Sequence, residues 1–141
     1  MVRLLVQCQT EEKLVSAVKR LWNGDWYAFA RDYFELESTV YDKLHCDWVG
    51  HFDLLTKFNE GYKHFDETKD AYLEPAITAM HKLAALGIPF EINTGAMSRG
   101  YRSAPYPSAA LLKELCACGG RILINSDSHS AYTIGYGFKQ A

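Results

Sequence analysis

Three short polar clusters combine histidine and carboxylate side chains, the residue types that bind divalent metal ions in proteins. Each cluster follows an apolar run, and the three are Gly50-His51-Phe52-Asp53, Glu91-Ile92-Asn93-Thr94-Gly95 and Asn125-Ser126-Asp127-Ser128-His129. If the apolar runs are parallel strands of an α/β fold, their carboxyl ends bring all three clusters to one edge of the sheet. The sequence therefore predicts one metal site at that edge.

Neutral imidazole nitrogen and carboxylate oxygen suit zinc, manganese or iron. Asp127 and His129 can offer two ligands from one tight loop, and His51 can offer another, with Gly50 permitting close approach of the backbone. Asp53 either orients His51 or caps the following helix. The alternative for the last loop is that Asp127 caps a helix beside a surface histidine.

Basic side chains at the same predicted edge indicate an anionic substrate. Arg99 and Arg102 lie in a loop rich in glycine and proline, and guanidinium groups bind phosphate bidentately. Lys57 adds a point charge, although each of these residues has the alternative of being a solvated surface charge. Glu91 and Asn93 alternate with apolar residues and so share one face of a strand, where a buried carboxylate needs a cation or hydrogen-bond donors.

The segments that would position these clusters alternate between helical and strand patterns. The expected strands are Asp47–His51, Ile88–Phe90 and Ile122–Ile124, and a polar stretch from Asn59 to Asp70 is expected to be an active-site loop. The expected helices are one capped by Thr10 that ends at Asn23-Gly24, one capped by Asp25 that runs to about Leu44, one with Pro75 in its first turn that stops at Gly87, and one that carries Leu111, Leu112 and Leu115 and ends at Gly119-Gly120. This alternation predicts parallel pairing with right-handed crossovers.

Composition and charge restrict the class of partner. A chain of 141 residues with 48% hydrophobic residues can bury the core of one domain. Its formal net charge of -2, without a basic stripe, excludes nucleic acid and anionic lipid as expected partners and favours a small molecule. No signal-peptide core or membrane span is evident, so we expect a cytoplasmic protein. The cysteines are expected to be reduced and mostly buried, and they are Cys8, Cys46, Cys116 and Cys118.

The motifs together resemble the histidinol-phosphatase branch of the polymerase and histidinol phosphatase (PHP) family of metallohydrolases. The similarity extends from about Thr10 to the end of the chain. It is carried by the run 47–58, DWVGHFDLLTKF, by residues 91–96, EINTGA, with the following SRGYR and PYP, by the terminal SDSH of residues 126–129, and by NGDWY at 23–27.

The resemblance implies an α/β fold that is the C-terminal part of a distorted parallel (β/α)7 PHP barrel. It implies hydrolysis of L-histidinol phosphate to L-histidinol and phosphate, a step of histidine biosynthesis, with divalent zinc, manganese or iron as cofactor. The implied metal ligands are His51, Asp127 and His129, of which Asp127 and His129 are also the implied catalytic residues. The implied phosphate-binding residues are Lys57 with Arg99 or Arg102, and the residues implied to support the ligands are Asp53, Glu91 and Asn93.

One departure from the family pattern changes what is expected of the chain. Family members begin with a His-x-His motif on the first strand, and no His-x-His occurs in this sequence. We therefore expect residues 1–141 to be a single partial PHP domain with little activity alone. Its exposed sheet edges imply self-association, a partner that supplies the missing half, or marginal stability. The alternatives are another PHP-type phosphoesterase and a truncated remnant without catalytic function.

Overall fold

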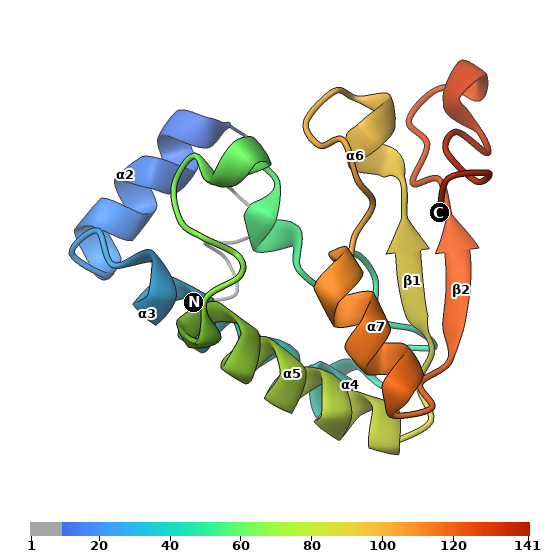
Figure 1. Ribbon diagram of the computed structural model, residues 1–141, viewed down its shortest axis with the longest axis horizontal. Helices are drawn as coiled ribbons and strands as arrows, with labels where there is room; N and C mark the ends of the chain where they lie inside the picture. The colour runs from blue at the N-terminus through green and yellow to red at the C-terminus, as the bar shows by residue number, and fades with distance from the viewer. Residues whose placement is uncertain (1–9) are drawn as a thin grey trace.

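The computed structural model describes residues 10–141 and shows a mixed α/β arrangement (Figure 1). Helices occupy one side of the molecule, and two parallel strands lie at the other. The α-helices are α2 (Glu11–Leu21), α3 (Trp26–Glu37), α4 (Val40–Leu44), α5 (Asp70–Ala85), α6 (Gly95–Ser98) and α7 (Ala109–Ala117). The strands are β1 (Phe90–Asn93) and β2 (Ile122–Asn125), and short 3-10 turns are η1 (Leu54–Thr56), η2 (Glu60–Tyr62) and η3 (Ala131–Thr133).

The first two helices begin at the capping residues that the sequence predicts. The Thr10 side chain accepts a hydrogen bond from the backbone N–H of Lys13, and the Asp25 carboxylate accepts from the backbone N–H groups of Tyr27 and Ala28. These bonds satisfy N–H groups that have no partner within the helix.

The second predicted helix does not continue to Leu44, because it breaks after Glu37. The Ser38 hydroxyl donates to the carbonyl of Glu35 at 2.7 Å, and the Thr39 hydroxyl donates to the carbonyl of Leu36 at 2.8 Å. Serine and threonine hydroxyls compete in this way with the backbone N–H groups that would extend a helix. The remaining residues form the separate short helix α4.

The two strands are parallel, as predicted, and pair in the register Phe90 with Ile122 through Asn93 with Asn125. The predicted strand Asp47–His51 is wrong as a strand, because only Val49 forms an isolated parallel bridge, with Phe90. Its N–H donates to the Pro89 carbonyl, after which the backbone turns at His51. Across the sheet the order is therefore the bridging residue Val49, then β1, then β2.

The core lies between the helices and β1. Helix α3 packs on α5, and α5 packs on α7 (Figure 1). The aromatic stripe of α3 is part of this packing, as predicted: Phe29 and Phe34 are fully buried, and Phe34 lies 5.5 Å from the ring of Tyr72 on α5. Helix α5 begins at Asp70, so Pro75 lies inside the helix and not in its first turn, and burial of Tyr72 and other residues of α5 offsets the cost of the proline.

Strand β2 is not the buried strand that its apolar sequence predicts. Ile122 and Ile124 keep 49% and 43% of their surface exposed, because no described segment covers the outer side of β2.

The expectation of mostly buried thiols is also wrong for the described part of the chain. Cys116 and Cys118 are exposed and Cys46 is half-buried, although all three are free thiols, and Cys8 lies outside the described residues.

No helix within residues 10–141 has both the length and the apolar character that a bilayer requires.

The arrowheads of β1 and β2 in Figure 1 point toward α6 and the C-terminal segment, so the residues that follow both strands gather at one end of the molecule.

Candidate metal- and anion-binding site

The buried carboxylate of Glu91 organises the end of the molecule at which the strands finish. Its Oε2 atom accepts a hydrogen bond from the backbone N–H of His51 at 2.9 Å and another from Asn93 Nδ2 at 2.9 Å. Its Oε1 atom accepts from Asn125 Nδ2 at 2.5 Å, and the side-chain oxygen Oδ1 of Asn125 in turn accepts from the backbone N–H of Asp127. One carboxylate and one amide thus link two predicted metal ligands that lie on different loops.

The sequence predicted that a buried Glu91 needs a cation or hydrogen-bond donors, and amide groups supply the donors. One of them is the side chain of Asn93, which lies on the same face of β1 as Glu91, as the alternation of polar and apolar residues indicates. Asn125 was not assigned a role from the sequence. The signal for it was its place at the end of an apolar strand beside Asp127, where a second amide can reach a neighbouring strand. Its pairing with Asn93 in the register of β1 and β2 explains why its side chain meets Glu91.

Two of the predicted ligands have an unusual backbone conformation. The φ angles of His51 and Asp127 are 28° and 43°, values that side-chain-bearing residues rarely adopt. Such strain costs of order 1–3 kcal/mol per residue and persists only where surrounding contacts hold it. The hydrogen bonds from both backbone N–H groups to the Glu91 and Asn125 side chains supply those contacts.

Asp127 is held by Arg99. The guanidinium donates from Nη1 to the backbone carbonyl of Asp127 at 2.8 Å and from Nη2 to its Oδ2 atom at 2.9 Å. The other carboxylate oxygen, Oδ1, lies 3.5 Å from Nε2 of His129. Partial burial acts to raise the pKa of the Asp127 carboxyl, but the hydrogen bond and charge of Arg99 outweigh it, so the pKa lies below its usual range. The Asp127 carboxyl is therefore ionised at neutral pH.

Glycines allow these close contacts. A Cβ atom at Gly95 would lie 2.7 Å from Arg99 Nη2 and 2.8 Å from Asp127 Oδ2, which is too close for any side chain. A Cβ atom at Gly50 would lie 3.3 Å from Glu91 Oε2, a tight contact. The prediction that Gly50 permits close backbone approach is consistent with this geometry.

Lys57 lies close enough to Arg99 for their charges to interact. Burial lowers the pKa of the Lys57 amine, and the neighbouring charge of Arg99 lowers it further. The amine lies over the ring of Tyr101, 4.5 Å from its centroid, an arrangement typical of a cation–π contact. Two cationic side chains thus flank Asp127, and Tyr101, which sequence reasoning did not single out, positions one of them.

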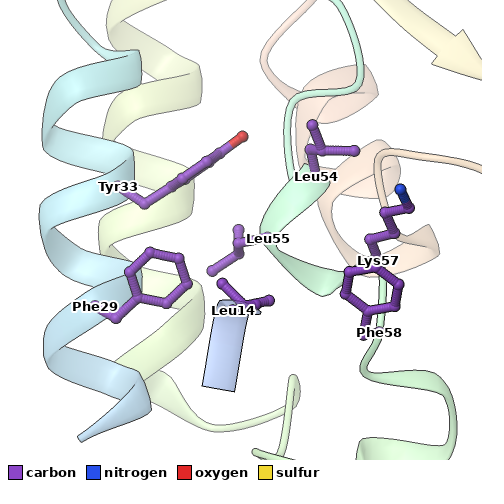
Figure 2. Close-up of a pocket in the computed structure, with 7 residues that line it drawn as sticks. All are labelled: Leu14, Phe29, Tyr33, Leu54, Leu55, Lys57 and Phe58. Atoms are coloured by element: carbon purple, nitrogen blue, oxygen red, sulfur yellow. The ribbon is translucent and has the colours of Figure 1, made fainter. Parts of the chain in front are cut away.

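A small cavity beside Lys57 does not form part of the site. Its volume is about 40 Å³, and it lies between α2, α3 and η1. In Figure 2 the Lys57 stem runs beside the cavity while its nitrogen points away from Leu14 and Phe29. The Tyr33 hydroxyl is occupied, since it donates to the backbone carbonyl of Phe52 at 3.1 Å. The remaining lining is apolar, which suits core packing and not a phosphate.

Arg102 has a different environment from Arg99. Its Nη1 and Nη2 atoms donate to the Glu67 carboxylate at 2.7 and 3.1 Å, and Nη1 also donates to the Thr56 carbonyl. Asn59 donates a further hydrogen bond to the same carboxylate, within the stretch 59–70 that was predicted to be an active-site loop. The structure therefore joins this stretch to the loop after β1 through a buried ion pair. A guanidinium bound in this way has two of its nitrogen atoms already engaged.

Asp53 is fully buried, and its Oδ2 atom accepts a hydrogen bond from the backbone N–H of Ser108 at 2.9 Å. The sequence predicted that Asp53 either orients His51 or caps the following helix. In the structure its side chain bonds neither His51 nor the N–H groups of η1, and its partner is Ser108, the residue before α7. Burial raises the pKa of the Asp53 carboxyl to about 7. A residue next to the site in sequence thus anchors a more distant helix.

The described residues meet only part of the requirement for a divalent metal site. Asp127 Oδ1 and His129 Nε2 lie on the same side of one loop, and their chemistry suits zinc, manganese or iron. Between Thr10 and Ala141, however, no set of three or more histidine, cysteine, aspartate or glutamate side chains is close enough to hold an ion. His129 is also 72% exposed. Two of the three predicted ligands therefore lie together, and His51 is joined to them through Glu91 and not directly.

Comparison with known proteins gives a distant similarity to a protein named as a phosphatase. No protein-family model matches the chain. A protein of Schizosaccharomyces pombe named probable histidinol-phosphatase is 30% identical over 112 residues, which is 78% of this chain. The chain spans 36% of the length of that relative. The chain is therefore distantly similar, over 78% of its length, to a protein named as a phosphatase.

Proposed function

We propose that this chain supplies the metal- and phosphate-binding end of a phosphatase that hydrolyses L-histidinol phosphate to L-histidinol and inorganic phosphate. The observation that carries the proposal is the contact of Arg99 with Asp127, with Lys57 alongside, after the parallel strands. An acid that binds metal and two cations that bind phosphate are the parts that metal-assisted phosphate hydrolysis requires. The relative named probable histidinol-phosphatase supports this choice of substrate.

The two oxygens of Asp127 suggest how the side chains divide the work. Oδ1 faces His129, so this pair would hold a divalent zinc, manganese or iron ion. His51 would become a further ligand only if its loop moved toward the pair, since the three side chains are not close enough together here. Oδ2 is fixed by Arg99, whose guanidinium is half-exposed and able to contact a phosphate. The metal, when bound, would polarise a phosphoryl oxygen and lower the pKa of a water molecule. Lys57 would add positive charge that offsets the charge of the phosphate.

Arg99 is the better candidate of the two arginines for binding phosphate. Arg102 already forms two hydrogen bonds with Glu67, and its side chain is only 10% exposed. Releasing it would leave Glu67 buried and unpaired, which is costly. We therefore assign phosphate contact to Arg99 and Lys57, and we assign to Arg102 the task of holding the loop that carries Arg99.

The fold proposed for this function is part of a parallel (β/α)7 barrel. The supporting observations are the parallel pairing of β1 with β2, the parallel bridge of Val49 on the other side of β1, and the packing of α3 on α5 and of α5 on α7. The exposed apolar residues of β2 are those that a further strand of such a barrel would cover.

Phosphate release from L-histidinol phosphate, measured together with metal content by elemental analysis, tests the proposal. The purified chain is compared with Asp127→Asn and with a control, His81→Ala, whose side chain pairs with Glu114 between α5 and α7. We expect metal binding and phosphate release to fall in Asp127→Asn and to remain in the control. Binding of neither metal nor inorganic phosphate by the unmodified chain would refute the proposal for this chain and favour a remnant without catalytic function. Release of phosphate from other monoesters alone would favour another phosphoesterase.

A further inference from the structure

Two aromatic rings from different segments contact the amine of Lys57. The Nζ atom lies over the ring of Tyr101, 4.5 Å from its centroid, and over the ring of Phe58, 5.0 Å from its centroid. The two rings also contact each other edge to face, with centroids 5.5 Å apart and an angle of 88° between their planes. Because the face of an aromatic ring attracts a cation, both rings favour this position of the amine.

The segments that carry the two rings are joined by a hydrogen bond next to this contact. Arg102 Nη1 donates to the backbone carbonyl of Thr56 at 2.9 Å, so the residue after Tyr101 is bonded to the residue before Lys57. Phe58 packs against the hydrophobic core, whereas Tyr101 keeps 37% of its surface exposed. The lysine side chain therefore starts from an anchored backbone, and its amine meets a ring that the other segment supplies.

Tyr101 belongs to the loop that also carries Arg99. The backbone N–H of Arg99 donates to the Gly95 carbonyl at 3.2 Å, and the backbone N–H of Tyr101 donates to the Ala96 carbonyl at 2.9 Å. Both residues are thus anchored to the short helix α6. The contact with Tyr101 therefore holds the Lys57 amine against the loop whose guanidinium forms the other half of the proposed phosphate site.

Ion pairs do not account for the position of the amine. Among residues 10–141, Lys57 forms no ion pair with a carboxylate, although several other lysines do. A lysine amine is carried on a flexible four-carbon stem, and fixing such a stem costs conformational entropy. Contacts that order the stem before a ligand arrives reduce the part of this cost that is paid on binding.

We propose that Tyr101 and Phe58 are positioning residues that hold the Lys57 amine beside the loop of Arg99, where the two cations together bind a phosphate group. The inference rests on the proposed function, because it takes Lys57 and Arg99 as the phosphate-binding pair. The rings do not bind the phosphate themselves and act through the lysine. Tyr101 is the better residue to vary, since it lies partly in solvent whereas Phe58 also packs on the core.

Calorimetric titration with inorganic phosphate tests the role of the ring. Tyr101→Leu should weaken phosphate binding about two- to fivefold, the value of one exposed cation–π contact. Tyr101→Phe keeps a ring and should bind as the unmodified chain does, and so should the control Tyr132→Leu, because Tyr132 is 98% exposed. Unchanged affinity in Tyr101→Leu would overturn the proposal. Tighter binding would also overturn it, since the ring would then compete with phosphate for the amine.

The same substitution in a Lys57→Met background separates positioning from a general structural effect. If Tyr101 acts through the lysine, Tyr101→Leu causes no further loss of phosphate affinity once the amine is absent. An equal loss in both backgrounds would show that the ring supports the loop by itself, and the positioning role would be wrong.

Proton NMR of the chain without phosphate tests the contact separately from the proposed function. Protons above an aromatic ring are shifted upfield by its ring current, so the ε-methylene protons of Lys57 should lie upfield of those of other lysines and move back in Tyr101→Leu. Absence of that shift would overturn the inference. If the shift is present but the unmodified chain binds no phosphate, the proposed function fails and the positioning role fails with it. If Lys57→Met weakens phosphate binding and Tyr101→Leu does not, only the inference fails.

Discussion

The buried ion pair between Glu67 and Arg102 predicts a large loss of stability when only one partner is changed. The side chains are 6% and 10% exposed and are joined by two hydrogen bonds of 2.7 and 3.1 Å. The substitution Glu67→Gln keeps the shape and removes the negative charge, so the guanidinium loses its buried counter-ion and keeps only the exposed carboxylate of Glu60, 3.5 Å from Nε. Breaking a buried pair in this way costs about 3–5 kcal/mol.

The expected effect on thermal unfolding follows from that free energy. For a domain of this size, a loss of 1 kcal/mol lowers the melting temperature by about 2–4 °C, so a loss of about 3 kcal/mol corresponds to about 6–12 °C. Circular dichroism at a helical wavelength measures the transition. The double variant Glu67→Gln with Arg102→Met should recover part of the loss, since it leaves no unpaired charge.

An exposed ion pair on the same protein provides the control. Lys82 and Asp42 approach to 4.0 Å with about half or more of each side chain exposed, so Lys82→Met should cost less than about 1 kcal/mol. The reasoning is refuted if Glu67→Gln lowers the melting temperature no more than Lys82→Met does, because the pair would then behave as a solvated surface contact.

Four further outcomes are expected from the structure. Replacing Arg99 by alanine should weaken inorganic phosphate binding about tenfold or more, measured by calorimetry, and equal affinity would contradict its assignment. Gly95→Ala should impair metal and phosphate binding together, because its Cβ atom would displace the Arg99 guanidinium; unchanged binding in calorimetric titrations would show that the loop can move. Burial raises the pKa of Glu37 to about 7 from 4.5, so the folded protein holds a proton that the unfolded chain releases in this interval. Stability should fall as pH rises from about 4.5 to 7, and urea titrations of Glu37→Gln should lack that component. If β2 mediates self-association, Ile124→Lys should reduce the mass measured by light scattering, whereas a monomeric unmodified chain would refute that expectation.

Local patterns were sufficient to predict much of the helical structure and the parallel strands. Thr10 and Asp25 begin helices through hydrogen bonds within three residues, and β1 and β2 follow from short apolar runs after glycines. The break after Glu37 was missed, because two hydroxyl groups there override a helical apolar pattern that continues beyond it. The predicted strand at Asp47–His51 reduces to one bridge, since pairing depends on the neighbouring strand and not on local composition.

The sequence was sufficient to predict the residue types of the candidate site, but not which side chains form hydrogen bonds and ion pairs with one another. The sequence brings Arg99 and Arg102 to one loop without distinguishing them, because their partners lie 28 and 35 residues away. Only the folded chain shows that one guanidinium holds Asp127 and the other holds Glu67. Likewise, Asp53 has a partner 55 residues away, which no capping rule for neighbouring residues could identify.

The network around Glu91 explains why the loops of the site can keep a strained backbone. His51 and Asp127 both have positive φ angles, and each backbone N–H is fixed by a side chain: Glu91 for the first and Asn125 for the second. Because Glu91 and Asn125 bond directly to one another, a movement of either loop would disturb a buried hydrogen bond of the other. The strain is therefore supported by the ends of β1 and β2, which place the two loops together before any ligand binds.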